Sequence, residues 1–286
     1  MLCAVCQSTQ ICKAFVKHGR DFFRCAACGL IFMHPLPSPP ELKEFYGKNY
    51  YAPWQIREGG MSDINRLKTA TFKKWISRIE RHGAKGCILD IGCAMGFFLE
   101  VAQARGWEPY GVEVSEYSHA IANRRFSNRI FQGDLLDAHF AGDHFDAVTL
   151  FDVIEHGMKP LETFKEIYRI LKPGGIVAIS TVNTCSLSSR LMRKKWPHYM
   201  PQHLHCFSPF NLALALKKEG FELLEIRKAK KVLNLRYIHS YLQTYPAPVL
   251  TGLSRFLFKV LPKSLTDLGL SLGCGEMLVI ARKKKN

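Results

Sequence analysis

The sequence has no long apolar segment. Among its 286 residues, no run reaches the ~18 consecutive apolar residues that a membrane-spanning helix requires. The chain begins MLCAVC, without the basic start and apolar core of a secretory signal. We therefore expect a cytoplasmic protein with no transmembrane segment. Peripheral contact with a membrane stays open as an alternative, because residues 234–245 and 248–261 are apolar with interspersed basic residues.

Two common phosphate-binding signatures are also absent. The G-x-G-x-x-G pattern of dinucleotide-binding folds fails at Ala94, which stands where its second glycine would be, and no G-x-x-x-x-G-K-[ST] loop occurs. Acidic residues are few: 24 Asp and Glu oppose 40 Lys and Arg, giving a formal net charge of +16. This charge favours an anionic partner, which could be a nucleic acid, a membrane surface or a phosphorylated small molecule.

The ten cysteines do not have the pattern of a secreted disulfide set. Four of them form two C-x-x-C pairs, Cys3 with Cys6 and Cys25 with Cys28, at the spacing of a four-cysteine zinc ribbon. A segment of about thirty residues buries little core, so bound Zn²⁺ would supply its folding energy. Because all four positions are cysteine, the predicted zinc site is structural. The alternatives are a redox pair and cysteines that fall at this spacing by chance.

We divide the chain into a cysteine-rich segment, a linker and one main domain. The cysteine-rich segment comprises residues 1–35, and the linker comprises residues 36–62, where we expect one or two helical turns and an aromatic loop. The main domain comprises residues 63–286 and begins with a predicted amphipathic helix over 63–82. It contains two expected insertions, residues 184–208 and 230–274.

One stretch of the main domain predicts a ligand site. Residues 87–91 read as a buried strand and residues from 97 onward as a helix, joined by Asp90-x-Gly92-x-x-x-Gly96. Glycines let the backbone turn tightly and approach a ligand, and the helix offers its N–H groups to that ligand. Further strands and helices then alternate along the chain, which predicts an α/β fold with a parallel, Rossmann-like sheet.

Acidic residues follow the next two strands. Glu113 lies about 20 residues past the glycine turn, where an acid accepts hydrogen bonds from the ribose hydroxyls of a nucleoside. Asp134 can accept from an adenine amine, and the N–H of Leu135 can reach the ring. The complete set of predicted cofactor-binding residues is Asp90, Gly92, Cys93, Gly96, Glu113, Val114, Asp134, Leu135, Phe151 and Asp152.

These motifs together resemble a known family. The segments DIGCAMG, GVEVS, GDLLD, FDAVTLFDVIEH and LKPGG, in this order between residues 64 and 224, resemble class I S-adenosylmethionine (SAM) methyltransferases. The resemblance implies SAM as the cofactor and a seven-stranded sheet whose seventh strand runs antiparallel between strands five and six. With its N-terminal CAVC…FRCAACGLIF, the chain is similar to zinc-ribbon methyltransferases of sugar and polysaccharide tailoring, including deoxysugar C-methyltransferases.

The resemblance favours a small-molecule acceptor, with a sugar nucleotide or related metabolite as the best candidate for O- or C-methylation. An RNA methyltransferase is the alternative, since some carry a zinc ribbon, but strand four lacks their asparagine-proline signature. A non-catalytic SAM-binding scaffold is a third hypothesis, which the intact motif residues oppose.

Transfer of a methyl group to oxygen or carbon can require a base. The candidates are His156, His198, His203 and His205, of which His203 is preferred and His156 comes second; a structural role is the alternative for each. We expect residues 184–208 to cap the acceptor pocket. Trp196 and Tyr199 would then form aromatic walls beside His203 and His205.

Overall fold

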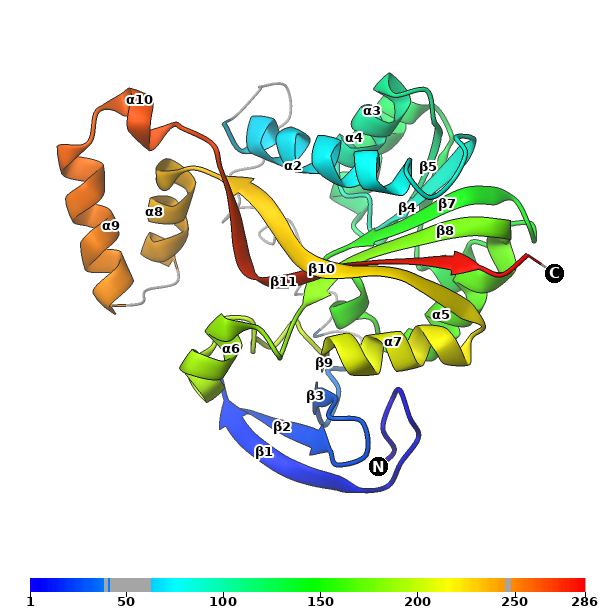
Figure 1. Ribbon diagram of the computed structural model, residues 1–286, viewed down its shortest axis with the longest axis horizontal. Coiled ribbons are helices and arrows are strands. Elements are labelled where there is room, and N and C mark those ends of the chain that lie inside the picture. The colour runs from blue at the N-terminus through cyan, green and yellow to red at the C-terminus, as the bar shows by residue number, and fades with distance from the viewer. Residues whose placement is uncertain (39–40, 42–62, 245–247, 286) are drawn as a thin grey trace.

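The computed structural model describes residues 1–38, 41, 63–244 and 248–285 (Figure 1). The aromatic loop and most of the helical turns that we expected in the linker lie outside these residues.

The core of the molecule is a mixed seven-stranded sheet in the order β10-β11-β8-β7-β4-β5-β6. Its strands are β4 (Cys87–Ile91), β5 (Glu108–Glu113), β6 (Ile130–Gln132), β7 (Phe145–Phe151), β8 (Leu171–Val182), β10 (Phe221–Leu233) and β11 (Leu270–Lys283). The pairs among β4 to β8 are parallel, whereas β11 is antiparallel to both β8 and β10. The expected Rossmann-like sheet is therefore confirmed, and its last strand lies antiparallel between the fifth and sixth.

Alternating side chains divide the core between the two faces of the sheet. On β4, Ile88 packs into one buried cluster, while Leu89 and Ile91 pack into the other. This follows from the two-residue period of a strand, which points successive side chains to opposite faces. The first cluster lies under α2 (Asp63–Ile79), α3 (Phe97–Ala104) and α4 (Glu116–Phe126), and the second under α5 (Pro160–Ile170) and α7 (Pro209–Lys218) (Figure 1).

Helix α7 begins at Pro209, directly after a capping box. The Ser208 hydroxyl accepts from the Asn211 N–H at 3.3 Å, and the Asn211 side chain accepts from the Ser208 N–H at 2.9 Å. Pro209 occupies the first helical position, where its missing N–H leaves no bond unmade. This reciprocal capping sets the point at which the chain leaves residues 184–208.

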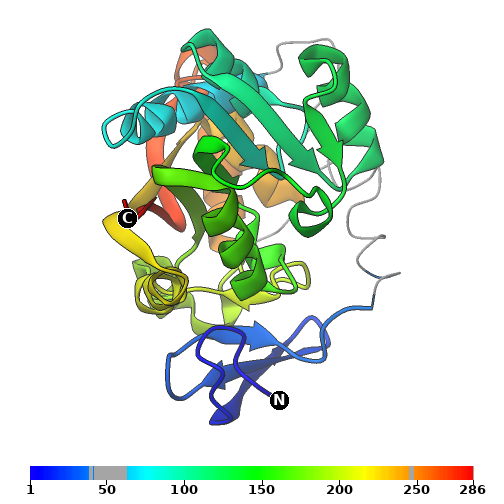
Figure 2. The same ribbon diagram turned by 90° about the vertical axis from the view of Figure 1, so that its right-hand side faces the viewer.

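The cysteine-rich segment forms a second sheet in the order β1-β2-β3-β9. Its strands are β1 (Ile11–Lys17), β2 (Arg20–Cys25), β3 (Ile31–Met33) and β9 (His205–Cys206). The last strand comes from residues 184–208, which also contain the short helix α6 (Leu187–Met192). Figure 2 shows this sheet beside α7 at one end of the molecule, and the Lys218 ammonium of α7 donates to the carbonyl of Val5 at 3.1 Å.

Strands β10 and β11 extend into the second expected insertion, residues 230–274. They stay paired from Phe221 opposite Lys283 to Leu233 opposite Leu270, so both ends of the 230–274 segment are strand. The ribbon leads to α8 (Leu235–Thr244), α9 (Pro248–Val260) and α10 (Lys263–Thr266), away from the main sheet (Figure 1). None of the helices in the described part of the chain is long and apolar enough to cross a membrane.

The segment Lys172–Gly175 belongs to a strand. Strand β8 begins at Leu171, directly after α5 ends at Ile170. Its pairing with β7 shifts between Phe145 and Ala147, which accommodates the glycines within the strand.

Candidate functional site

A cavity of about 2050 Å³ lies where β4, β5 and β7 end. Ligands of open α/β sheets bind outside the carboxyl ends of the strands, so this is the expected place for a site. Nine of the ten predicted cofactor-binding residues line the cavity, namely Asp90, Gly92, Cys93, Glu113, Val114, Asp134, Leu135, Phe151 and Asp152. Gly96 is not among its lining residues and lies at the start of α3.

The turn after β4 requires glycine at two positions. Gly92 has φ +70°, and a Cβ there would lie 2.5 Å from a methyl carbon of Val153. Gly96 has φ +84°, and a Cβ there would lie 2.6 Å from the ring of Phe126. Both residues adopt a left-handed backbone conformation that is unfavourable for residues other than glycine. The motif therefore keeps the turn tight against its neighbours as well as open toward the cavity.

Glu113 connects this turn to the end of β5. One carboxylate oxygen accepts from the N–H of Ala94 and the other from the N–H of Ser115, both at 2.8 Å. Burial raises the pKa of the Glu113 carboxyl, although these N–H groups favour its ionised form. The carboxylate thus sits at the cavity wall in a position fixed by two main-chain donors.

Asp90 and Asp134 differ in their surroundings. Asp90 is buried, its carboxylate accepts from the Thr149 hydroxyl at 2.6 Å, and burial raises its pKa to about 7. Asp134 is exposed at the rim, where it accepts from the N–H of Leu136 at 2.9 Å and caps the short helix Leu135–Asp137. Asp90 therefore links the end of β4 to β7 through Thr149, whereas Asp134 lies where a ligand can reach it.

Phe151 and Asp152 end β7. The Phe151 ring packs against Phe72, Trp75 and Phe98, at centroid distances of 5.9, 4.8 and 5.0 Å. Asp152 has φ +59°, an unusual value for a residue with a side chain.

Main-chain and side-chain contacts with Ser180 hold Asp152 in this conformation. The N–H of Asp152 donates to the Ser180 carbonyl at 2.9 Å, and the Ser180 hydroxyl donates to the Asp152 carboxylate at 2.8 Å. Backbone strain of this kind persists only where the surroundings hold it, and it concentrates at functional sites.

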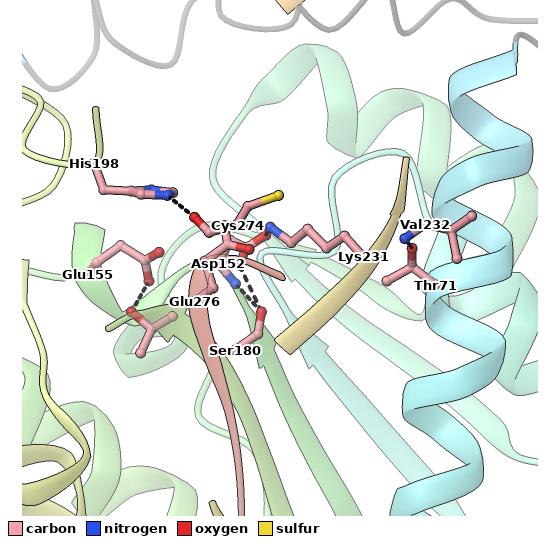
Figure 3. A network of polar contacts seen from close by, with 10 residues as sticks. Thr71, Asp152, Glu155, Ser180, His198, Lys231, Val232, Cys274 and Glu276 are labelled. Carbon is pink, nitrogen blue, oxygen red and sulfur yellow. Dashed lines mark hydrogen bonds and ion pairs between the residues drawn. The ribbon is translucent and has the colours of Figure 1, made fainter. Parts of the chain in front are cut away.

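Lys231 is a site residue that sequence reasoning missed. Its ammonium lies 2.7 Å from a carboxylate oxygen of Asp152 and 2.7 Å from one of Glu276 (Figure 3). Burial alone would lower the pKa of Lys231, but the two carboxylates raise it well above its usual value. Burial likewise opposes ionisation of Asp152, and the Lys231 ammonium outweighs it and lowers the pKa of Asp152. No local sequence signal marks Lys231, since only the long β10–β11 ribbon brings it here.

Lys68 of α2 also lines the cavity. Burial, followed by repulsion from the Lys231 ammonium, lowers its pKa to about 8. The cavity therefore presents a second amino group beside the paired Lys231.

The two preferred histidines come together at the cavity wall. The rings of His156 and His203 meet edge to face at a centroid distance of 4.8 Å. Nδ1 of His203 lies 2.8 Å from the carbonyl oxygen of His198, so it must be the donor, and Nε2 keeps the lone pair. Burial lowers the pKa of His156 to about 4 and that of His203 well below its usual value. Both imidazoles are therefore neutral near pH 7.

The other two candidate bases, His198 and His205, have different surroundings. Nδ1 of His205 donates to the carbonyl of Gly157 at 3.0 Å, and His205 is not among the residues lining the cavity. His198 does line the cavity, and its Nε2 lies 2.9 Å from the carbonyl oxygen of Cys274 (Figure 3). The predicted place of His205 at the acceptor is therefore wrong.

The predicted aromatic walls are also wrong. Trp196 and Tyr199 are buried in a cluster with Phe22 and Met33 of the cysteine-bearing sheet. The ring of Tyr199 lies 4.8 Å from that of Phe15. The pairing of β9 with β3 carries this part of residues 184–208 toward the second sheet, so its large aromatic side chains pack between the two sheets. The residues of this segment that line the cavity are His198, Met200, Gln202 and His203.

Glu155 is a second residue that sequence reasoning passed over. It is buried, its carboxylate lies 2.8 Å from the donating hydroxyl of Thr181, and burial with the nearby charge of Asp152 raises its pKa to about 8 (Figure 3). The FDVIEH segment places Glu155 directly before His156, but its approach to His203 depends on the fold. One ligand atom of each of Glu155, His156 and His203 lies within 4.8 Å of the others.

Among the residues that the structure describes, the four paired cysteines form a second potential metal-binding group. Their sulfur atoms all lie within 4.8 Å of one another, with Cys3 and Cys28 at 3.5 Å and Cys6 and Cys25 at 3.4 Å. Tetrahedral coordination with Zn–S bonds of ~2.3 Å places sulfurs about 3.8 Å apart. The donor set and spacing therefore fit a Zn²⁺ ion, whereas Cys12 is exposed and outside the group.

The sheet order, its antiparallel strand and the cavity beside the glycine turn define a class I SAM-dependent methyltransferase. The chain belongs to the methyltransferase-domain family, which matches residues 65–226. It is 32% identical over 143 residues to a ubiquinone biosynthesis O-methyltransferase of Pseudomonas aeruginosa, covering 46% of this chain and 58% of that one. It is 28% identical over 182 residues to the enzyme of the same name from Aromatoleum aromaticum, covering 58% of this chain and 74% of that one.

Solved structures show the same fold at low identity. A SAM-dependent methyltransferase of Thermotoga maritima has a TM-score of 0.54 at 21% identity and covers 85% of this chain and 99% of that one. One from Archaeoglobus fulgidus has a TM-score of 0.54 at 20% identity, covering 77% and 94%. These comparisons establish the fold and the family of this chain, which spans 58% of the length of the Pseudomonas relative.

Proposed function

We propose that the cavity binds SAM through the predicted residues and methylates a small molecule at its other end. The glycine turn would approach the methionine part, Glu113 would accept from the ribose hydroxyls, and Asp134 with the N–H of Leu135 would hold the adenine. The observation that carries this proposal is the position of Glu113, whose carboxylate is fixed by two N–H groups at the cavity wall, 2.8 Å from each.

Replacing Glu113 should weaken SAM binding. Glu113→Ala removes the charged acceptor of the ribose hydroxyls, so we expect a loss of about 1.5–3 kcal/mol, roughly 10–150-fold in Kd. Isothermal titration calorimetry measures this. Glu108→Ala, at the other end of the same strand, is the matched control and should bind SAM like wild type. Equal affinities of the two variants would contradict the assignment of Glu113.

We propose O-methylation of a hydroxyl-bearing small molecule. Two findings support this: the related sequences are named O-methyltransferases, and two neutral imidazoles stand at the cavity wall. The net charge of +16 and the Lys68 amino group favour an anionic acceptor. The resemblance to sugar-tailoring enzymes makes a sugar nucleotide or related metabolite the first acceptor to test.

Within this proposal, His203 is the first candidate for the base that takes the acceptor's proton, and His156 is the second. Incubation of the protein with labelled SAM and a panel of sugar nucleotides, other hydroxylated metabolites and RNA tests the acceptor class. We expect label in a small molecule together with S-adenosylhomocysteine. Label found only in a defined RNA nucleotide would overturn the proposal.

We further propose that residues 1–35 form a structural zinc ribbon, with Zn²⁺ held by Cys3, Cys6, Cys25 and Cys28. The support is the close group of four sulfur atoms, which has the number and spacing of ligands that a tetrahedral ion requires.

Removing one of these thiols should release the metal. Purified wild-type protein should contain one Zn²⁺ per chain by elemental analysis. Cys25→Ser should hold well under half of that and unfold at a temperature several degrees lower, because metal binding supplies folding free energy to so small a segment. Cys12→Ser, in the same sheet but outside the group, should keep its zinc. A wild-type protein that is folded but contains no metal would contradict the ribbon.

A further inference from the structure

We propose that Glu155, His156 and His203 bind a divalent transition-metal ion at the wall of the cavity. The inference deepens the proposed function, on which it rests for what the ion would do. The site itself stands on the geometry of the three side chains, all of which line the cavity.

The three residues form a compact set of ligands. One ligand atom from each lies within 4.8 Å of the other two. Neighbouring ligands around an ion with bonds of ~2.0–2.2 Å are about 3–3.5 Å apart, so a closure of about 1 Å completes the site. Glu155 and His203 are buried and His156 is half-buried, which leaves one side of the group open to the cavity.

Each ligand is oriented by a second group. Nδ1 of His203 donates to the carbonyl of His198 at 2.8 Å, which leaves the lone pair on Nε2. The ring of His156 forms a hydrogen bond with the main chain of Gln202. An imidazole that donates through one nitrogen carries its lone pair on the other, and such outer partners are typical of metal-binding histidines.

The carboxylate is oriented in the same way. The Thr181 hydroxyl donates to one oxygen of Glu155 at 2.8 Å and so restrains the carboxyl group. The partners come from different elements: Thr181 from β8, and His198 and Gln202 from residues 184–208. The fold thus brings together three ligands, each of which is oriented by a different partner.

The donor set selects the kind of ion. Two imidazoles and one carboxylate suit Zn²⁺, Fe²⁺ or Co²⁺, whereas Mg²⁺ and Ca²⁺ prefer oxygen ligands alone. Three protein ligands leave coordination positions for a ligand in the cavity, as in catalytic metal sites. The Lys231 ammonium nearby is balanced by Asp152 and Glu276, which limits its repulsion of a cation.

An ion here would activate the acceptor hydroxyl. Binding of the oxygen to the metal lowers the pKa of the hydroxyl, whose proton passes to water. The oxygen then forms a bond to the methyl carbon as the carbon–sulfur bond of SAM breaks, and the sulfonium leaves as a neutral thioether. In this form His203 is a metal ligand, and the ion takes the place of a protein base.

Titration with Co²⁺ tests the site. Co²⁺ bound by nitrogen and oxygen shows visible ligand-field bands, whereas Co²⁺ bound by cysteine adds a sulfur charge-transfer band, so the two potential sites are distinguished. We expect one saturable nitrogen–oxygen site per wild-type chain. Glu155→Gln and His203→Gln should each weaken it about tenfold or more, since even outer partners contribute that much. Glu162→Gln, which changes an acid elsewhere in the cavity lining, is the matched control and should match wild type.

SAM affinity, measured in each variant, shows whether the fold is retained. Wild-type protein that binds SAM but shows no nitrogen–oxygen cobalt site would overturn the inference. A cobalt site that both ligand variants keep unchanged would overturn it too, because the ion would then lie elsewhere. Methyl transfer that rises as the site fills supports the activating role. A cobalt site that responds to both variants, in a protein that methylates no small molecule, would support the metal site and overturn only the proposed function.

Discussion

His203→Ala should lower turnover by about 10²–10⁴-fold while SAM affinity stays within about twofold of wild type. The loss follows from the position of the imidazole, which is neutral, lines the cavity and meets His156 at a centroid distance of 4.8 Å. Either as the base or as a metal ligand, it would act on the acceptor and leave the SAM end untouched. Single-turnover measurements of methyl transfer, calorimetry with SAM and thermal unfolding together test this.

His205→Ala is the matched control for that prediction. His205 lies two residues further along the same segment, is also buried and donates to the carbonyl of Gly157, but it does not line the cavity. This variant should lose stability, because it removes a buried ring and leaves the carbonyl of Gly157 without its donor, and it should keep its activity per folded molecule. If His203→Ala behaves like His205→Ala, the role of His203 is structural. If His203→Ala is fully active and His156→Ala is inactive, His156 takes over the role.

Lys231→Met should lower the free energy of unfolding by about 3 kcal/mol. The substitution leaves Asp152 and Glu276 without the ammonium that lies 2.7 Å from each. Glu276 is buried, with a side chain 9% exposed, so its unpaired charge is costly. The Asp152 side chain is 39% exposed, and water compensates part of its loss, which places the effect at the lower end of the range for buried pairs. Urea unfolding measures the difference.

Lys230→Met provides the control, since the neighbouring lysine on β10 is exposed. Its effect should stay within about 0.5 kcal/mol, as for most surface substitutions. The double variant Lys231→Met/Asp152→Asn should recover part of the stability, because it removes one of the two carboxylates that Lys231→Met leaves unpaired. A Lys231→Met protein as stable as Lys230→Met would show that the ion pairs contribute nothing to folding.

Local patterns of the sequence determined the central part of the fold. The strand at 87–91, the glycine turn and the following helix are specified by residues that are neighbours in the chain, through apolar runs and glycines at required positions. Since all these strands run the same way, their carboxyl ends meet at one edge, and nine of the ten predicted cofactor residues reach one cavity. Each cysteine pair lies on its own short turn, so the spacing C-x-x-C also specifies that the two thiols of a pair are neighbours.

Only the tertiary structure decided which side chains face the far end of the cavity. Lys231 reaches Asp152 because the β10–β11 ribbon crosses the site. Glu155 approaches His203 because residues 184–208 return to the turn that follows β7, where His205 donates to the carbonyl of Gly157. Trp196 turns away because β9 pairs with a strand of the cysteine-rich segment, more than 170 residues earlier in the chain. The register between such distant partners depends on the packing of the whole molecule. The periods of 2 and 3.6 residues show which face of a strand or helix is buried, but they do not show which distant segments pair. The sequence patterns therefore misplaced Trp196 and missed Lys231.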